Sequence, residues 1–154
     1  MYLKKLSLYN FRNYKELNID FCSNWNILVG DNGIGKTNIL EAIYYSSTTR
    51  SPRTTNLTDL INLDSPESTF SINVDFIQDT ILETQIQNIK HRYFQTKEKS
   101  QKNIKLNNKN VSIMDLLGKI PFVYFVPEDL NIIKSESKFR RKLLDFILFQ
   151  TDVK

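Results

Sequence analysis

The sequence has only one cysteine and one histidine, and only four glycines and four prolines, among its 154 residues. The lone Cys22 excludes an internal disulfide and fits a reducing cytoplasm, and we expect it to be a small buried or half-buried apolar residue. The longest apolar run, Phe122 to Val126, is far short of the roughly 20 residues that a membrane-spanning helix needs. The first residues contain no apolar segment typical of a signal peptide. We therefore expect a cytoplasmic protein without membrane association.

The composition is that of a globular chain with room for one domain. The apolar fraction is 40% and the aromatic fraction is 12%, both ordinary values for a packed core. The formal net charge is +4 and the pI is about 9.1. This mild excess of positive charge permits a polyanionic partner but does not require one.

Three of the four glycines lie in one segment, Gly30 to Thr37, which fits the pattern G-x-x-x-x-G-K-[ST]. Gly30 and Gly35 allow the backbone to curl and to approach an oxyanion closely. Successive N–H groups, together with the start of a helix, would bind the α- and β-phosphates of a nucleotide. Lys36 would reach the β- and γ-phosphates, and the Thr37 hydroxyl would bind Mg²⁺. The predicted nucleotide-binding residues are Gly30, Asp31, Asn32, Gly33, Ile34, Gly35, Lys36 and Thr37.

The residues around this segment have the order that a P-loop requires. An apolar run at 25–29 predicts a short strand that leads directly into it. Residues 36–47 predict a helix with one apolar stripe, formed by Ile39, Leu40, Ile43 and Tyr44. A Rossmann dinucleotide site is excluded, because the third glycine of G-x-G-x-x-G is missing.

Alternating apolar residues predict antiparallel strands before and after the P-loop. Leu6 and Leu8 begin one strand, residues 17–21 form the next, and a turn at 10–14 joins them. Residues 70–76 and 81–89 predict a β meander in which His91 is a surface residue. The remaining predicted elements are a short helix at 58–63, a hairpin turn at 107–110, a short helix at 114–120, a buried strand at 122–126 and a helix from about residue 138.

Pro127, Glu128 and Asp129 follow the predicted strand at 122–126 and allow three interpretations. An apolar strand that ends in acids resembles a Walker B motif, but there the aspartate follows the strand directly and here a proline intervenes. The acids can instead stand near a γ-phosphate, as in the Q-loop of related ATPases. They also suit the first turn of a helix, where the helix dipole favours them for structural reasons alone. The roles of Glu128 and Asp129 therefore stay open.

Several motifs resemble those of the ABC/SMC-type ATPases. The P-loop followed by Asn38 to Ile43 is similar to their Walker A motif and first helix, and residues 8–14 resemble their strand-turn entry with the letters N-F-R. Three further segments resemble the RecF family of recombination mediators, namely residues 49–54, 125–130 and 139–145. These motifs occur in the family's order and cover most of the chain.

The resemblance implies an α/β P-loop NTPase head of the ABC/SMC type with an antiparallel β lobe. The P-loop lobe would comprise about 1–63 and 119–154, and the β-rich lobe about 64–118. It further implies ATP and Mg²⁺ as ligands and an ATP-dependent homodimer. It also implies binding to single-stranded or gapped DNA and work with other recombination mediators in recombinational repair, replication and the SOS response.

The sequence departs from the family in the motifs that complete a catalytic site. No Ser-Gly-Gly signature segment occurs, no Walker B motif is assigned, and His91 lies too early to be the switch histidine. We therefore interpret the chain as the truncated, N-terminal half of such a protein, expect marginal stability in isolation, and assign no catalytic residue. The full-length family would be a weak DNA-dependent ATPase. The alternatives are a nucleotide-dependent dimerisation module without hydrolysis, or the head of another SMC-like ATPase.

Basic residues outside the P-loop are further candidates for phosphate contacts. Arg12 matches a basic residue that approaches the α-phosphate in SMC-like heads, and a solvated turn arginine is the alternative. Arg50 and Arg53 follow the first helix and can meet nucleotide, partner or DNA. Arg140 and Arg141 lie in a basic cluster on the last helix, where a solvated face and a DNA-binding face are both open.

Overall fold

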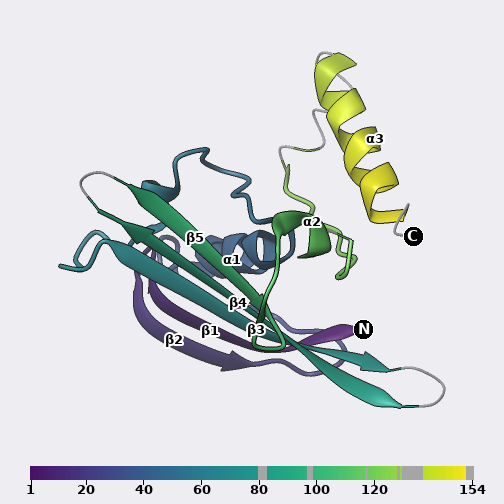
Figure 1. Cartoon of the computed structure of the whole chain (residues 1–154), viewed down its shortest axis with the longest axis horizontal. Helices are drawn as coiled ribbons and strands as arrows, with labels where there is room; N and C mark the ends of the chain where they lie inside the picture. The colour runs from purple at the N-terminus through teal and green to yellow at the C-terminus, as the bar shows by residue number, and fades with distance from the viewer. Residues whose placement is uncertain (80–82, 97–98, 117, 128, 130–136, 152–154) are drawn as a thin grey trace.

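The computed structural model describes residues 1–79, 83–96, 99–116, 118–127, 129 and 137–151. Its main feature is one six-stranded sheet in the order β2-β1-β3-β4-β5-β6, in which all neighbouring strands are antiparallel. The strands are β1 (Tyr2–Phe11), β2 (Tyr14–Asp20), β3 (Thr69–Asp79), β4 (Thr84–Gln95), β5 (Ser100–Leu106) and β6 (Lys109–Asn110). The helices are α1 (Lys36–Thr48), the 3-10 helix η1 (Leu57–Leu60), α2 (Ile113–Leu116) and α3 (Ser137–Thr151). Helix α1 lies against one face of the sheet (Figure 1).

The sheet forms where the sequence alternates. The strands predicted at Leu6 and Leu8, at 17–21 and at 70–76 are confirmed in β1, β2 and β3, and the run predicted at 81–89 is confirmed in β4 from Thr84 on, whereas 81–82 lie outside the described residues. Leu6 is paired with Val74 and Leu8 with Ile72, so the inward side chains of β1 and β3 meet in a common core. The predicted hairpin turn is also confirmed. Asn107 and Asn108 have φ of 48° and 65°, the left-handed backbone that a tight two-residue turn between β5 and β6 requires.

Helix α1 occupies the predicted residues but docks on a different stripe. Its buried apolar side chains are Ile39, Ala42 and Tyr45, whereas Leu40 is 44% exposed. The predicted stripe is therefore partly wrong. Spacing of three residues places these side chains on one side of the helix, and Tyr45 packs edge-on against Phe70 at 5.7 Å between ring centroids.

Two predicted strands, at 25–29 and 122–126, are not strands. Trp25 is 92% exposed and Val123 is 95% exposed, whereas Leu28, Phe122 and Tyr124 are half-buried, so neither run is buried as a whole. A strand needs a neighbour for its backbone hydrogen bonds, and neither run is paired with another segment in the part of the chain that the structure describes. The apolar character of these runs predicted burial, but it could not show whether a neighbouring strand is present to pair with them.

The lone histidine and the lone cysteine both differ from the predictions. His91 is buried, 4% exposed, because it occupies an inward position of β4 opposite Ile72 and Ile104. Its Nε2 lies 2.9 Å from the backbone oxygen of Ser46 in α1, so it joins helix to sheet. Cys22 is exposed, because the chain bends away from the sheet after β2.

The helices predicted at 58–63 and 114–120 are shorter in the structure, and residue 117 lies outside the described residues. Helix η1 replaces the helix predicted at 58–63, and α2 ends at Leu116. Helix α3 confirms the helix predicted from about residue 138, and Figure 1 shows it projecting away from the sheet. One sheet contains strands from both sides of the predicted lobe boundary near residue 63. The division of the chain into two lobes stays a prediction. Among the described helices, none is long and apolar enough to cross a membrane.

Burial of His91 predicts a pH-dependent stability. Burial lowers the pKa of His91 from 6.5 to about 4, with Lys102 adding to the decrease and the Ser46 carbonyl opposing it. His91 therefore takes up its proton near pH 6.5 in the unfolded chain but only near pH 4 in the folded chain. This contribution to stability is complete above pH 6.5 and is lost as the pH falls toward 4. Between pH 7 and pH 5 we expect the free energy of unfolding to decrease by about 2 kcal/mol in urea titrations.

His91→Gln is the control for this prediction, because an amide N–H can replace the imidazole donor but does not titrate. The variant should lose most of the slope between pH 7 and pH 5. An equal slope in both proteins would contradict the assignment to His91.

Candidate P-loop site

The P-loop residues lie together at the start of helix α1. Gly35 is the residue before the helix and has φ of 110°, in the left-handed region that favours glycine. No side chain caps this helix start, and its first turn contains no acidic residue. The first amides and the positive end of the helix dipole therefore remain available to an anion.

Lys36 and Thr37 place a cation and a hydroxyl beside these amides. The Lys36 ammonium donates to the carbonyl oxygens of Gly30 at 2.6 Å and Asp31 at 2.7 Å, so it closes the loop over the helix start. The Thr37 side chain is exposed in the first helical turn. An uncapped helix start followed by a lysine and a threonine supplies the groups that suit a nucleoside triphosphate, namely free amides, a cation and a hydroxyl for Mg²⁺.

The turn between β1 and β2 holds the P-loop through side-chain hydrogen bonds. Asn13 Nδ2 donates to the carbonyl oxygen of Ile34 at 2.9 Å, and the Tyr14 hydroxyl donates to the same oxygen at 3.4 Å. Asn38 Nδ2 donates to Asn13 Oδ1 at 2.8 Å, which ties the helix to the turn. A Cβ atom at Gly35 would lie 2.5 Å from the Tyr14 oxygen, so a side chain here would force the Tyr14 and Asn13 side chains to move.

Glu41 is a fully buried carboxylate on the same helix, with 0% of its surface exposed. Arg12 binds it with two nitrogens, Nε to Oε2 at 2.9 Å and Nη2 to Oε1 at 2.6 Å. The Ser51 hydroxyl donates to Oε1 at 2.5 Å. Arg12 Nη1 also donates to the backbone oxygen of Asp59 at 2.8 Å. A paired geometry of this kind is the arrangement in which a buried charge is stable.

Arg53 connects this carboxylate to the P-loop helix start. Its Nη1 donates to Asn38 Oδ1 at 2.8 Å and to Glu41 Oε2 at 3.2 Å, while its side chain is 48% exposed. A continuous series of side-chain contacts thus runs from the Ile34 carbonyl through Asn13, Asn38 and Arg53 to Glu41.

The structure brings two of the predicted arginines together and leaves the others apart. Arg12 and Arg53 meet at Glu41, whereas Arg50 is exposed in the loop after α1. Arg140 and Arg141 are exposed on α3, which Figure 1 shows away from α1. Phosphate contacts of all these arginines stay predictions.

The sequence alone did not reveal the roles of Glu41, Asn13 and Ser51. In the sequence, Glu41 is only one residue of the helix motif Asn38 to Ile43. The available signal was its position between Leu40 and Ala42, because a carboxylate inside an apolar helix segment needs partners if it is buried.

Phe122 and Tyr124 pack against α1 next to this site. Tyr44 contacts the rings of Phe122 at 5.3 Å and Tyr124 at 5.0 Å between centroids. Burial raises the pKa of Tyr124, and the nearby Glu41 carboxylate adds to the rise. Asp129 accepts a hydrogen bond from the Val126 amide at 2.9 Å and donates its own amide to the Val126 oxygen at 2.9 Å. These bonds are typical of a helix start, and Glu128 lies outside the described residues.

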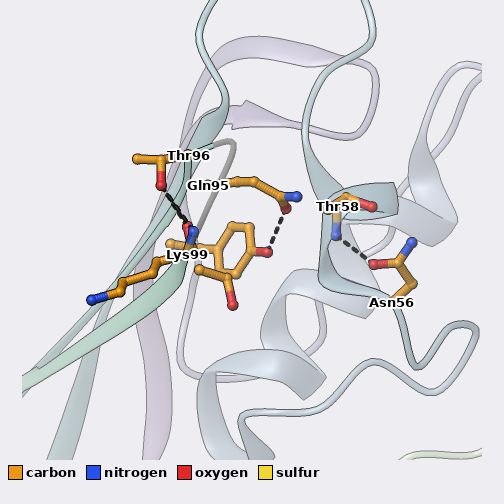
Figure 2. Close-up of a pocket in the computed structure, with 7 residues that line it drawn as sticks. Asn56, Thr58, Gln95, Thr96 and Lys99 are labelled. Carbon is orange, nitrogen blue, oxygen red and sulfur yellow. Dashed lines mark hydrogen bonds between the residues drawn. The ribbon is translucent and has the colours of Figure 1, made fainter.

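A separate open hollow of about 280 Å³ lies between the start of η1 and the end of the β4–β5 hairpin. Figure 2 shows Asn56 and Thr58 on one side and Gln95, Thr96 and Lys99 on the other. These elements do not include the P-loop, so the hollow is not part of the site described above.

Comparisons with known proteins agree with this geometry. Residues 2–130 match the model of the RecF/RecN/SMC N-terminal domain. The chain is 43% identical over 151 residues to the DNA replication and repair protein RecF of Clostridium kluyveri, covering 96% of this chain and 38% of that protein. A solved structure of the recombination mediator protein RecF with ATP is 35% identical, with a TM-score of 0.78, over 94% of this chain and 38% of that one.

A solved structure described as concerning ATP-driven dimerization and DNA-stimulated activation of SMC ATPases has a TM-score of 0.76. It is 24% identical and covers 96% of this chain and 99% of that one, and so shows the shared fold. The chain thus spans about two fifths of the RecF relative's length. The predicted ABC/SMC-type fold and the resemblance to RecF are confirmed. The chain belongs to the RecF/RecN/SMC N-terminal domain family.

Proposed function

We propose that this chain binds ATP and Mg²⁺ through Gly30 to Thr37 and contributes this site to a RecF-type DNA replication and repair protein. The observation that carries the proposal is the uncapped start of α1, where the Lys36 ammonium contacts the glycine loop and Thr37 is exposed in the first turn. Support comes from the solved RecF structure, whose description includes ATP.

Each residue of the P-loop would have a distinct role. Backbone amides of the loop and of the first helical turn would hold the α- and β-phosphates. The Lys36 ammonium would exchange its two carbonyl acceptors for oxygens of the β- and γ-phosphates. The Thr37 hydroxyl would hold Mg²⁺, which neutralises phosphate charge when bound.

The wider role in the cell is a proposal that rests on the RecF relatives. It comprises an ATP-dependent homodimer, work with other recombination mediators, a part in the SOS response, and a cytoplasmic location. It also includes binding to single-stranded or gapped DNA. Arg140 and Arg141 are candidates for phosphate contacts there, because both are exposed on a helix that projects from the sheet.

Lys36→Ala should weaken binding of Mg²⁺-ATP by at least about tenfold, because the variant loses the point charge at the phosphates. Equilibrium titration by calorimetry measures this change. Lys15→Ala is the matched control, since it removes an equal charge from an exposed position in β2. Equal affinity of Lys36→Ala and wild type would overturn the nucleotide site.

The Arg140→Ala/Arg141→Ala double variant tests the DNA surface. Each lost phosphate contact should reduce the slope of log K against log salt by about 0.9 on duplex DNA, and so by about 1.8 for both. Fluorescence anisotropy with a gapped duplex, between low and moderate salt, measures the slope. Lys4→Ala/Lys15→Ala is the control with the same change of charge, and an unchanged slope in the arginine variant would exclude both arginines.

A further inference from the structure

Glu41 is the most deeply buried charged group described in this chain, and it binds side chains from two separate segments. Its two oxygens accept hydrogen bonds from Arg12 in the β1–β2 turn and from Ser51 and Arg53 in the loop after α1. Both of these segments also reach the P-loop. The turn supports the Ile34 carbonyl through Asn13, and the loop reaches Asn38 through Arg53.

The position of Glu41 on the helix connects these contacts to the phosphate end. Glu41 follows Thr37 by four residues, which is about one helical turn. The carboxylate therefore holds two guanidinium groups one turn away from the proposed Mg²⁺ ligand. Because its surface is completely buried, its acceptor positions are fixed by packing and are not averaged by solvent.

We propose that Glu41 is a positioning residue of the nucleotide site, which orders the 12–14 turn and the 51–53 loop around the P-loop and thereby raises ATP affinity. The inference rests on the proposed function. It assigns Glu41 a role through Arg12 and Arg53, without contact to the nucleotide.

Electrostatics alone predicts the opposite change in ATP affinity when Glu41 is neutralised. Glu41 is a negative charge near a site for a polyanion, so neutralising it would raise ATP affinity if charge alone mattered. Removing it would also release two arginines for phosphate binding. The positioning role predicts instead that affinity falls, because the turn and the loop lose their common anchor.

The test is Mg²⁺-ATP titration of Glu41→Gln in the whole chain, with thermal unfolding measured in the same buffer. We expect about tenfold weaker binding by protein that is folded at the assay temperature. Glu16→Gln is the matched control, since Glu16 is exposed on β2 and the change of charge is identical. Affinity equal to or higher than that of wild type in Glu41→Gln would overturn the proposal.

Glu41→Asp separates positioning from packing. Gln has the shape of Glu but not its charge, whereas Asp keeps the charge and is one methylene shorter. A positioning role predicts that Asp retains more ATP affinity than Gln. A packing role predicts the reverse order, and that result would also overturn the proposal.

Two further variants keep the test decisive. If Glu41→Gln is unfolded, Arg53→Gln replaces it, because this half-exposed side chain can be changed while the Arg12–Glu41–Ser51 contacts remain. We then expect about threefold weaker binding, and unchanged affinity would overturn the role. Lys36→Ala is measured alongside. Normal binding by Lys36→Ala removes the nucleotide site itself, whereas weak binding by Lys36→Ala with normal binding by Glu41→Gln removes only the role of Glu41.

Discussion

The close contact between Gly35 and the β1–β2 turn is the constraint on which the rest of the site depends. The Tyr14 hydroxyl and the Asn13 amide lie where a side chain of residue 35 would begin. The turn can therefore support the loop directly, and the start of α1 is fixed against the sheet without a capping side chain. An uncapped but well-supported helix start is the condition for using its amides on a ligand.

Glu41 supplies the second fixed point of the same helix. Gly35 fixes the first turn, and six residues later the buried Glu41 carboxylate holds Arg12 and Arg53. Arg12 and Asn13 are adjacent residues of the turn after β1, so one short turn is held at both points. His91 provides a third link, from β4 to the backbone of Ser46 near the far end of α1. The helix is thus held along its length by polar contacts as well as by its apolar side.

Patterns that depend on near neighbours could be predicted from the sequence. The alternation in β1 and β3, the left-handed asparagines at 107 and 108, and the P-loop itself all follow from local chemistry. Features that depend on partners far away in the sequence could not be predicted. The runs at 25–29 and 122–126 are apolar but unpaired among the described residues, and His91 is polar yet buried because the sheet register turns it inward. Glu41 is the same case in the site, since its donors come from segments 10 and 29 residues away.

The most direct test of the account compares Gly35→Ala with Gly33→Ala in Mg²⁺-ATP titrations. Both glycines have positive φ, 110° and 84°, so both variants carry backbone strain, but only at Gly35 would the new methyl group meet the β1–β2 turn. The account predicts that Gly33→Ala retains measurable ATP binding and that Gly35→Ala loses it. ATP binding by Gly35→Ala that equals or exceeds that of Gly33→Ala would contradict it.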